Sequence, residues 1–290
     1  MYITLFGQQF KKALRAKVFT QGWGIKILIG FLVLYFGLSF LALGFLLPEI
    51  IHETHPGEAL VTPIFGEFVL YYVLVDLAMR FFLQDLNVLS VQHYLLQPIK
   101  KKTIINYLLG SSIFNFFNLL PLLFIIPFAI RAAIPELGVM SGVSWLAAMV
   151  FLVLTDHFLA IYIKRVAAVK QLVFVLFAAI VALLFAANAL EWISLRDASI
   201  VVFGKLGEWW FAIVILLVVG LVYAVNFGFL LRNTYIDKWK KQKVTAVAQN
   251  FDFLESKGVI GTMMSNELKL ILRNKRTKSI LLITALFSAY

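Results

Sequence analysis

Long apolar runs separated by short polar segments make up most of this chain. Each run holds about 20 residues, enough for a helix to cross the ~30 Å hydrocarbon core of a bilayer. The alternating segments of about ten residues that are typical of outer-membrane barrels do not occur. The pattern predicts an all-α, polytopic membrane protein whose six transmembrane helices lie at residues 25–47, 61–83, 104–130, 140–163, 171–190 and 209–231.

Prolines and polar stretches mark the expected ends and irregularities of these spans. Pro48 is expected to end the first span, and Pro121 and Pro127 to kink the third, because each proline removes an intrahelical hydrogen bond. The polar stretch 191–208 is expected to form a loop between the last two spans.

An amphipathic segment, residues 3–20, precedes the first span. Its apolar side chains, which include Phe10 and Leu14, recur at helical spacing, whereas Lys11 and Arg15 fall mostly elsewhere. This pattern predicts a helix that lies in the membrane interface.

The basic pattern of this segment returns near the other end of the chain. Lys11, Leu14, Arg15 and Lys17 align in spacing with Lys269, Leu272, Arg273 and Lys275. The apolar run 280–290 that follows is too short to cross a bilayer. It reads either as an incomplete seventh span of a truncated sequence or as the end of an interfacial helix. With truncation as the favoured reading, the expected organisation is a first six-span unit at 1–232, a cytoplasmic linker at 233–265, and the start of a second unit at 266–290.

Charge supports membrane insertion and predicts its direction. Charged residues make up 14 % of the chain and hydrophobic residues 62 %, whereas soluble domains carry about 25 % charged residues. The net charge of +11 has a simpler cause than nucleic-acid binding, because cytoplasmic loops of membrane proteins are rich in Lys and Arg. With the N-terminus in the cytoplasm, every basic residue lies in a cytoplasmic segment except Arg80, Arg131, Arg196 and Lys205.

Several classes of chemistry are excluded by what the sequence lacks. It contains no cysteine, so disulfides, thiolate catalysis and Cys-based metal sites are ruled out. No P-loop, His-Glu-x-x-His, Gly-x-Ser-x-Gly or Gly-x-Gly-x-x-Gly motif occurs. The chain therefore cannot bind and hydrolyse ATP through a P-loop, and few candidates for a catalytic group are left inside the spans.

Ionisable residues inside the spans are the main site candidates, because burial in lipid makes them costly. Asp76 and Arg80 stand at i and i+4 on one face of the second span, and Asp156 is expected at a similar depth. The group is either a helix-locking ion pair or a relay for protons or ions, and the lock is the favoured reading. Glu67 stands alone in the outer half of its span, and His157 is expected to be a satisfied packing residue that neighbours Asp156.

Other polar residues receive simpler interpretations. His52, Glu53 and His55 match no metal-binding spacing and are expected to be solvated, so no metal site is predicted. Four asparagines inside or beside the spans are expected to form interhelical hydrogen bonds; they are Asn115, Asn118, Asn188 and Asn226.

The cytoplasmic segment 84–103 carries more apolar side chains than a solvated loop requires, which predicts a short helix that docks on the inner leaflet or on a partner. It ends in a motif that resembles the loop before span three of ABC-2 type transporter permeases. The matching residues are Tyr94, Leu95, Leu96, Pro98, Ile99, Lys100, Lys101 and Lys102. The N-terminal amphipathic segment likewise resembles the elbow helix of that family, through Phe10, Lys11, Leu14, Arg15 and Lys17.

The resemblance, which extends to bacterial ABC-2-like permeases with duplicated six-span halves, implies a function. It implies a permease subunit of an ATP-driven exporter in the bacterial cytoplasmic (inner) membrane, with a second permease half or protomer. The resemblance therefore implies a transport subunit and not an enzyme, with no cofactor bound by this chain. A separate ATPase subunit would bind ATP and Mg²⁺ and contact segment 84–103, which in the family forms a coupling helix. Two alternatives stay open: an ion-coupled secondary transporter that uses Glu67, Asp76 and Asp156, and a membrane scaffold that transports nothing.

Overall fold

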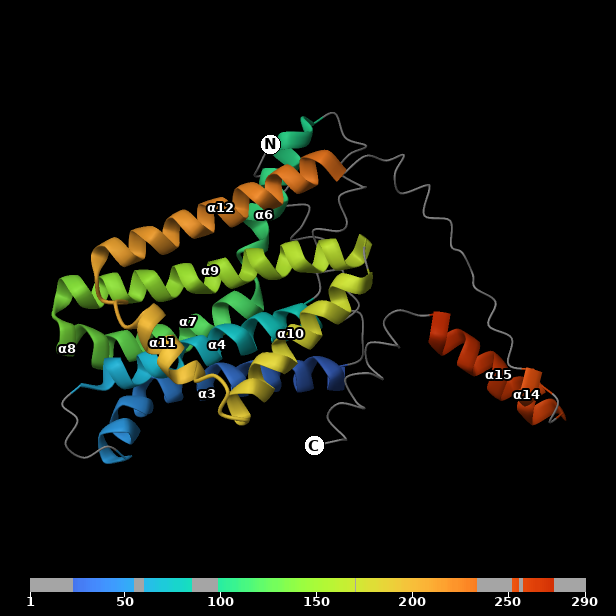
Figure 1. Ribbon diagram of the computed structural model, residues 1–290, viewed down its shortest axis with the longest axis horizontal. Helices are drawn as coiled ribbons and strands as arrows, with labels where there is room; N and C mark the ends of the chain where they lie inside the picture. Colours follow the sequence, from blue (N-terminus) through green and yellow to red (C-terminus); the bar gives the residue numbers. More distant parts are fainter. Residues whose placement is uncertain are drawn as a thin grey trace. The chain divides into compact units, whose positions relative to one another are not determined.

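A computed structural model describes residues 23–54, 60–84, 99–169, 171–233, 252–255 and 258–273 of the chain. The described residues form helices and turns and include no strand (Figure 1). They fall into two units, Met1–Tyr235 and Ile236–Tyr290. The expected elbow helix at 3–20, most of segment 84–103 and the expected start of a seventh span at 280–290 lie outside the described residues.

Helices in the first unit follow the predicted order of spans. They are α3 (Trp23–Thr54), α4 (Val61–Leu83), α6 (Lys101–Ser112), α7 (Phe116–Phe128), the π-helical turn η2 (Ala129–Ala133), α8 (Ile134–Leu137), α9 (Val139–Val169), α10 (Gln171–Ala189), α11 (Leu195–Phe203) and α12 (Trp209–Asn233).

Five stretches of described helix are long and apolar enough to cross a membrane, which confirms an all-helical membrane protein. They are Trp23–Thr54, Val61–Leu83, Phe116–Leu137, Val139–Ala167 and Trp209–Arg232. The remaining expected span is present as α10, a helix of 19 residues whose apolar stretch, Val175–Ala189, is shorter than the others. Six spans therefore remain a prediction.

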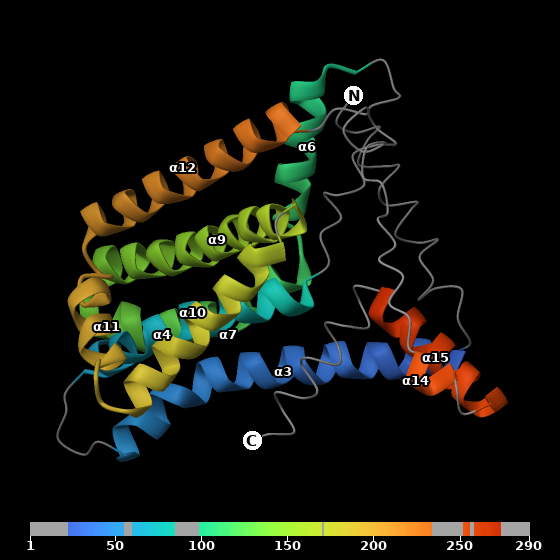
Figure 2. The same ribbon diagram turned by 45° about the vertical axis from the view of Figure 1, so that its right-hand side comes forward.

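The long helices place their ends in two groups. Helices α4, α9 and α12 run in one direction, while α3 and α10 run in the other (Figures 1 and 2). One end of the bundle gathers the starts of α3, α6 and α10 and the ends of α4, α9 and α12. We call this the basic end, since the described charges there are Lys26, Lys100, Lys101, Lys102, Lys164, Arg165 and Arg232.

The opposite end, which we call the acidic end, carries most of the described carboxylates of the first unit. Its acidic residues are Glu49, Glu53, Glu67, Glu136, Glu191, Asp197 and Glu208, and its basic residues are Arg131, Arg196 and Lys205. No described residue at the basic end is acidic. The charge asymmetry inferred from sequence is thus an asymmetry between the two ends of one helical bundle.

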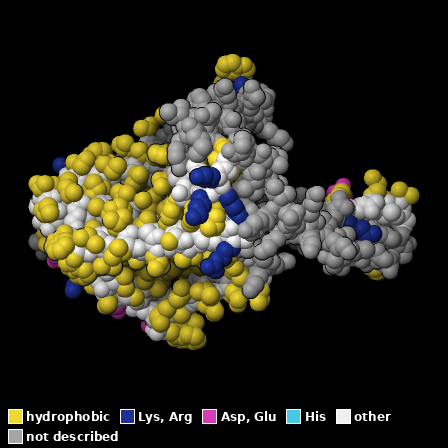
Figure 3. Space-filling model, turned by 90° about the horizontal axis from the view of Figure 1, so that it is seen from above, with side chains coloured by type: hydrophobic (Ala, Val, Ile, Leu, Met, Phe, Trp, Pro, Cys, Tyr) yellow, Lys and Arg dark blue, Asp and Glu magenta, His cyan; other side chains and the backbone are white. Residues whose placement is uncertain are grey.

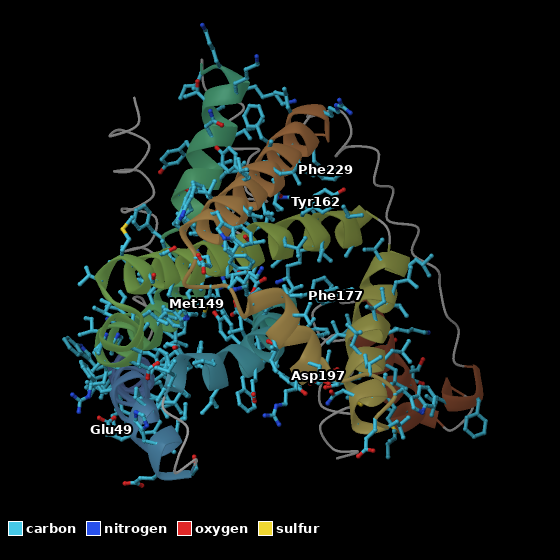
Figure 4. The ribbon with its side chains drawn as sticks, turned by 60° about the vertical axis from the view of Figure 1, so that its left-hand side comes forward. Glu49, Met149, Tyr162, Phe177, Asp197 and Phe229 are labelled. Atoms are coloured by element: carbon cyan, nitrogen blue, oxygen red, sulfur yellow. The ribbon has the colours of Figure 1, made fainter. Side chains whose placement is uncertain are left out.

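Helix α9 lies at the centre of the bundle and contacts α4, α7, α10 and α12. Near the acidic end its Trp145 packs on Phe128 of α7, with ring centroids 5.4 Å apart, and Phe128 packs on Phe65 of α4 at 4.5 Å. Near the basic end, Tyr162 of α9 meets Phe229 of α12 at 5.9 Å (Figure 4). Two buried apolar clusters, one toward each end of the bundle, therefore pack its helices together.

Pro48 does not end the first helix, as the sequence had suggested, because α3 continues through it to Thr54. A helix that continues past Pro48 lacks one backbone hydrogen bond, the one that the carbonyl of Gly44, four residues earlier, would have accepted. Ending the helix inside a bilayer would leave several backbone groups unpaired, at a cost of several kcal/mol each. The helix therefore extends until it reaches the polar residues His52 and Glu53.

The prediction that residues 104–130 form one kinked helix is wrong. The chain forms α6 up to Ser112, breaks over Ile113–Asn115, and resumes as α7. Pro121 and Pro127 both lie inside α7 and interrupt neither it nor the following turn. The break between two half-helices is therefore the main irregularity of the bundle, and it lies before the prolines.

The predicted loop 191–208 and linker 233–265 also contain helix. Helix α11 packs on α4, and its first turn is capped by the Ser194 hydroxyl, which accepts a hydrogen bond from the backbone N–H of Asp197. In the second unit, α14 (Asp252–Glu255) precedes α15 (Gly258–Arg273), which crosses the expected boundary at residue 266. The first unit ends at Tyr235, three residues beyond the predicted limit of 232.

Candidate functional site: a buried polar cluster at a helix break

Arg80 is the centre of a polar cluster inside the bundle. Its side chain has 0 % solvent exposure, and its Nε donates to Asp76 Oδ2 at 2.6 Å. Its Nη1 donates to the Asn118 side chain and its Nη2 to the carbonyl of Phe117 at 2.6 Å. The i,i+4 ion pair expected from sequence is therefore present, and it is tied to the first turn of α7.

A missing backbone donor explains why Arg80 reaches Phe117. In a regular helix the carbonyl of Phe117 would accept a bond from the N–H four residues later, but that residue is Pro121, which has no N–H. The guanidinium takes over this orphan carbonyl, and Asn118 in turn donates to the carbonyl of Ile113 in the break. One cation thereby joins α4 to the half-helix that begins after the break.

Asp156 and His157 of α9 face the same cluster. Asp156 is 2 % exposed, and its Oδ2 has no hydrogen-bond partner among the described residues. His157 is fully buried, with Nε2 2.9 Å from the Ser112 hydroxyl and Nδ1 3.4 Å from the Gln84 amide. His157 is thus the satisfied packing residue that the sequence suggested.

Lys164 and Gln84 close the cluster toward the basic end. The Lys164 ammonium donates to the carbonyl of Arg80 at 3.3 Å and to the carbonyl of Gln84. Those carbonyls belong to the last turn of α4, where a cation is favourable. The end of α4 is therefore fixed to α9 just before segment 84–103 begins.

Glu67 is not alone, contrary to the sequence expectation. Arg196 of α11 pairs with it, with Arg196 Nε 2.7 Å from Glu67 Oε2. A second exposed pair at the acidic end joins Arg131 to Glu49 at 2.6 Å. Arg196 and Arg131, two of the four basic residues outside the segments predicted to be cytoplasmic, thus hold neighbouring elements together.

Two polar contacts over long sequence distances were not predicted. The carboxylate of Glu136 accepts bonds from the backbone N–H groups of Val61 and Thr62, at 2.8 and 2.9 Å, and so caps α4. The Ser199 hydroxyl of α11 donates to the carbonyl of Gly66 at 2.6 Å and accepts from the N–H of Leu70 at 3.0 Å, which inserts it into the hydrogen-bond ladder of α4. No local pattern signals either contact.

The asparagines divide into two groups. Asn118, Asn188 and Asn226 bond to other elements, as expected: Asn188 accepts from Tyr71 at 3.1 Å, and Asn226 donates to the carbonyl of Phe158 at 2.9 Å. Asn115 instead caps α7 with its backbone carbonyl, which accepts from Asn118 and Leu119.

The basic end presents a group of cationic side chains. Lys100 and Lys102 are exposed at the start of α6, and the Lys101 ammonium donates to the carbonyl of Leu231 at 2.6 Å, which ties α6 to the end of α12. Arg165 is 4 % exposed, and none of its guanidinium nitrogens has an acceptor among the described residues. Figure 3 shows Lys and Arg side chains gathered beside a broad apolar surface.

The coupling motif and the elbow segment fall largely outside the described part of the chain. Tyr94, Leu95, Leu96 and Pro98, together with the elbow residues Phe10, Lys11, Leu14, Arg15 and Lys17, lie outside the described residues. Of the motif that carries the family resemblance, Ile99 and the three lysines that follow are described. Among the described residues, no group of His, Asp and Glu could hold a metal ion.

Comparison with known proteins matches the chain to a family. A family model described as "Family of unknown function (DUF5687)" matches residues 9–290. The chain belongs to the DUF5687 family. The match includes the first unit of this DUF5687 protein from residue 9 onward, all of the second unit, and the whole polar cluster around Arg80. No curated protein and no solved structure matches the chain. The family description states no activity, so membership in DUF5687 by itself assigns none.

Proposed function

We propose that this chain is the membrane-spanning permease subunit of an ATP-driven exporter of the ABC-2 type. A separate ATPase subunit would bind ATP and Mg²⁺ and act on segment 84–103, and a second permease half or protomer would complete the transporter. The observation that carries the proposal is the anchoring of both ends of that segment to the bundle at its basic end.

The first anchor lies at Gln84. Its carbonyl accepts a hydrogen bond from Lys164, and its side-chain amide meets His157, both on α9. The second anchor lies at Lys101, which bonds to the carbonyl of Leu231 on α12. A force applied to segment 84–103 therefore reaches α4, α6, α9 and α12 together, which is the requirement for a coupling element.

The path continues from α6 into the interior. Helix α6 ends at the break, and the far side of the break is held by the bonds from Arg80 to Asn118 and the Phe117 carbonyl. Discontinuous helices form the substrate and ion sites of many transporters. We infer that movement of α6 is relayed to the cluster and changes how α7 packs against α4.

Co-purification tests the coupling. The full-length chain carrying an affinity tag is purified from native membranes, and the eluate is assayed for ATP hydrolysis and for a chain with a Gly-x-x-x-x-Gly-Lys-Ser/Thr motif. Replacing both Lys100 and Lys102 by glutamine should reduce recovery of that chain by roughly tenfold, equivalent to about 1.4 kcal/mol. Deleting residues 92–102 should abolish recovery.

Lys205→Gln is the control, because it makes the same Lys-to-Gln change, at one position, at the acidic end. It should leave ATPase recovery unchanged, and all variants should insert in the membrane. The coupling proposal fails if the wild-type chain recovers no ATPase, or if the Lys100 and Lys102 replacements have no more effect than the control.

We also propose that the chain lies in the bacterial cytoplasmic membrane with its N-terminus and basic end in the cytoplasm. The absence of cysteine allows a direct test, since each introduced cysteine is the only one. In intact spheroplasts, an impermeant maleimide should label the Lys205→Cys variant. The Lys102→Cys variant should be labelled only after permeabilisation. The reverse pattern would show that the orientation is inverted.

A secondary transporter driven by ions is the second candidate, and one observation favours it. Asp156 is a buried carboxyl group with an unpartnered oxygen beside Asp76. The contribution of Glu67 to such a mechanism is weakened by its pairing with Arg196. Transport measured with and without a proton gradient separates the two candidates. In a secondary transporter, neutral replacements at Asp76 and Glu67 should make transport independent of the gradient, whereas transport by an ATP-driven exporter should not depend on the gradient through these residues. A membrane scaffold that transports nothing is the third reading, and no observation in the bundle favours it.

A further inference from the structure

Two carboxyl groups meet inside the cluster, one from α4 and one from α9. The Asp76 and Asp156 side chains lie within hydrogen-bonding contact of each other. Asp76 Oδ2 also accepts a hydrogen bond from the Nε–H of Arg80 at 2.6 Å. Asp156 is 2 % exposed and one of its oxygens, Oδ2, has no donor among the described residues. The pair is therefore buried, and its two members have unequal surroundings.

The charges on the surrounding elements do not balance a second carboxylate. Helix α4 supplies Arg80 and the hydroxyl of Tyr72, and α9 supplies His157 and Lys164, whose ammonium is bound to carbonyls at the end of α4. The other charged residues of these two helices lie away from the pair: Glu67 is bound to Arg196 at the acidic end, and Arg165 lies nine residues beyond Asp156, at the basic end. Helices α6 and α7 face the cluster with the neutral Ser112 and Asn118.

The remaining elements packed on α4 and α9 place their charged groups at the two ends of the bundle. Residues 171–189 of α10 include no charged side chain. The charged residues of these elements are Lys26, Glu49 and Glu53 on α3, Lys101 and Lys102 on α6, Arg131 on η2, Glu136 on α8, Arg196 and Asp197 on α11, and Arg232 on α12.

Hydrogen-bonding chemistry limits how such a pair can exist. An ionised carboxylate only accepts hydrogen bonds, so two carboxylates in contact repel, whereas a protonated carboxyl donates one bond to its neighbour. A second uncompensated charge buried in the bundle would be strongly unfavourable. We propose that the Asp76–Asp156 pair binds one proton, carried by Asp156, while Asp76 stays ionised against Arg80.

The proton has a mechanical consequence in this geometry. Without it, Asp156 becomes a second anion that competes with Asp76 for the guanidinium of Arg80. Movement of Arg80 toward Asp156 would weaken its bonds to Asn118 and to the Phe117 carbonyl, which hold the start of α7. Proton release would therefore loosen the helix break, whether an ATPase or an ion gradient drives the protein.

Infrared spectroscopy of the purified full-length chain in lipid nanodiscs tests the site without a substrate or an ATPase. At neutral pH the wild-type protein should show a carbonyl stretch of a protonated carboxylic acid that shifts in heavy water. The band should be lost in the Asp156→Asn variant and kept in the Glu53→Gln variant, which changes an exposed carboxylate at the acidic end. Absence of the band from the wild type, or its persistence in Asp156→Asn, overturns the proposal.

Thermal unfolding provides an independent measurement. An amide has the shape and charge of a neutral acid, so Asp156→Asn should unfold at the same temperature as the wild type, whereas Asp76→Asn should unfold at a clearly lower temperature because Arg80 loses its counter-ion. Failure of Asp156→Asn to fold, or equal losses in both variants, would show that Asp156 is a second carboxylate partner of Arg80. Stabilisation by sodium but not choline chloride that disappears in Asp156→Asn would assign the site to a metal cation and likewise overturn the proposal.

Discussion

Replacing Arg80 by methionine is expected to lower the free energy of unfolding by about 3–5 kcal/mol, the cost of removing one partner of a buried ion pair. The replacement keeps an unbranched apolar side chain but leaves the Asp76 carboxylate, the Asn118 amide and the Phe117 carbonyl without their donor. Thermal or denaturant unfolding of the purified protein in nanodiscs measures the loss.

An exposed ion pair in the same chain supplies the matched control. Arg196→Met breaks the pair with Glu67, in which the arginine side chain is 63 % exposed, so the expected loss is about 1 kcal/mol or less. The double variant Asp76→Leu with Arg80→Met should regain part of the stability lost by Arg80→Met, because it leaves no unpaired charge from that pair. Equal losses for Arg80→Met and Arg196→Met would contradict the central place given to Arg80.

The i,i+4 ion pair is the part of the candidate site that sequence could predict. Spacing puts Asp76 and Arg80 on one helix face, and the cost of charge in a membrane makes their pairing the expected outcome. The positions of the long helices and the gathering of basic residues at one end follow equally from local composition. These features depend only on residues close together in the chain.

The connection of this pair to α7 depends on information that is not local. Pro121 was expected to kink a helix, and its actual effect is to free a carbonyl that Arg80 occupies from another helix. The pattern of apolar residues cannot show where a span breaks when both halves are equally apolar. The break at Ile113–Asn115 was missed for this reason.

Contacts of α4 with distant segments show the same limit. Its N-terminus is capped by Glu136, 75 residues away from Val61, because the preceding residue, Leu60, has no side chain that can cap. The backbone hydrogen-bond ladder of α4 is interrupted at Gly66 by Ser199, which lies 133 residues away in the sequence. Such partners become predictable only once the packing of α4 against α8 and α11 is known, so Glu67 was expected to be alone although Arg196 lies beside it.

Glycine spacing in α3 leads to the second large effect. Gly30, Gly37 and Gly44 recur every seven residues and share one face of the helix. A Cβ at Gly44 would lie 2.4 Å from the carbonyl oxygen of Phe124 and 3.1 Å from Pro127 Cβ, both on α7. Backbone atoms cannot move aside as a flexible side chain can, so the two helices must separate to admit even one methyl group.

Gly44→Ala should therefore lower the free energy of unfolding by about 1–3 kcal/mol, the typical cost of overpacking. Gly30→Ala makes the same chemical change where no atom lies within 4 Å, and it should raise stability by up to about 1 kcal/mol because alanine favours the helix. Gly37→Ala, whose Cβ would lie 3.7 Å from Leu123, should fall between them. Unfolding midpoints measured in one lipid composition would decide the order. If the three variants were equally stable, α3 and α7 would not be in backbone contact at Gly44.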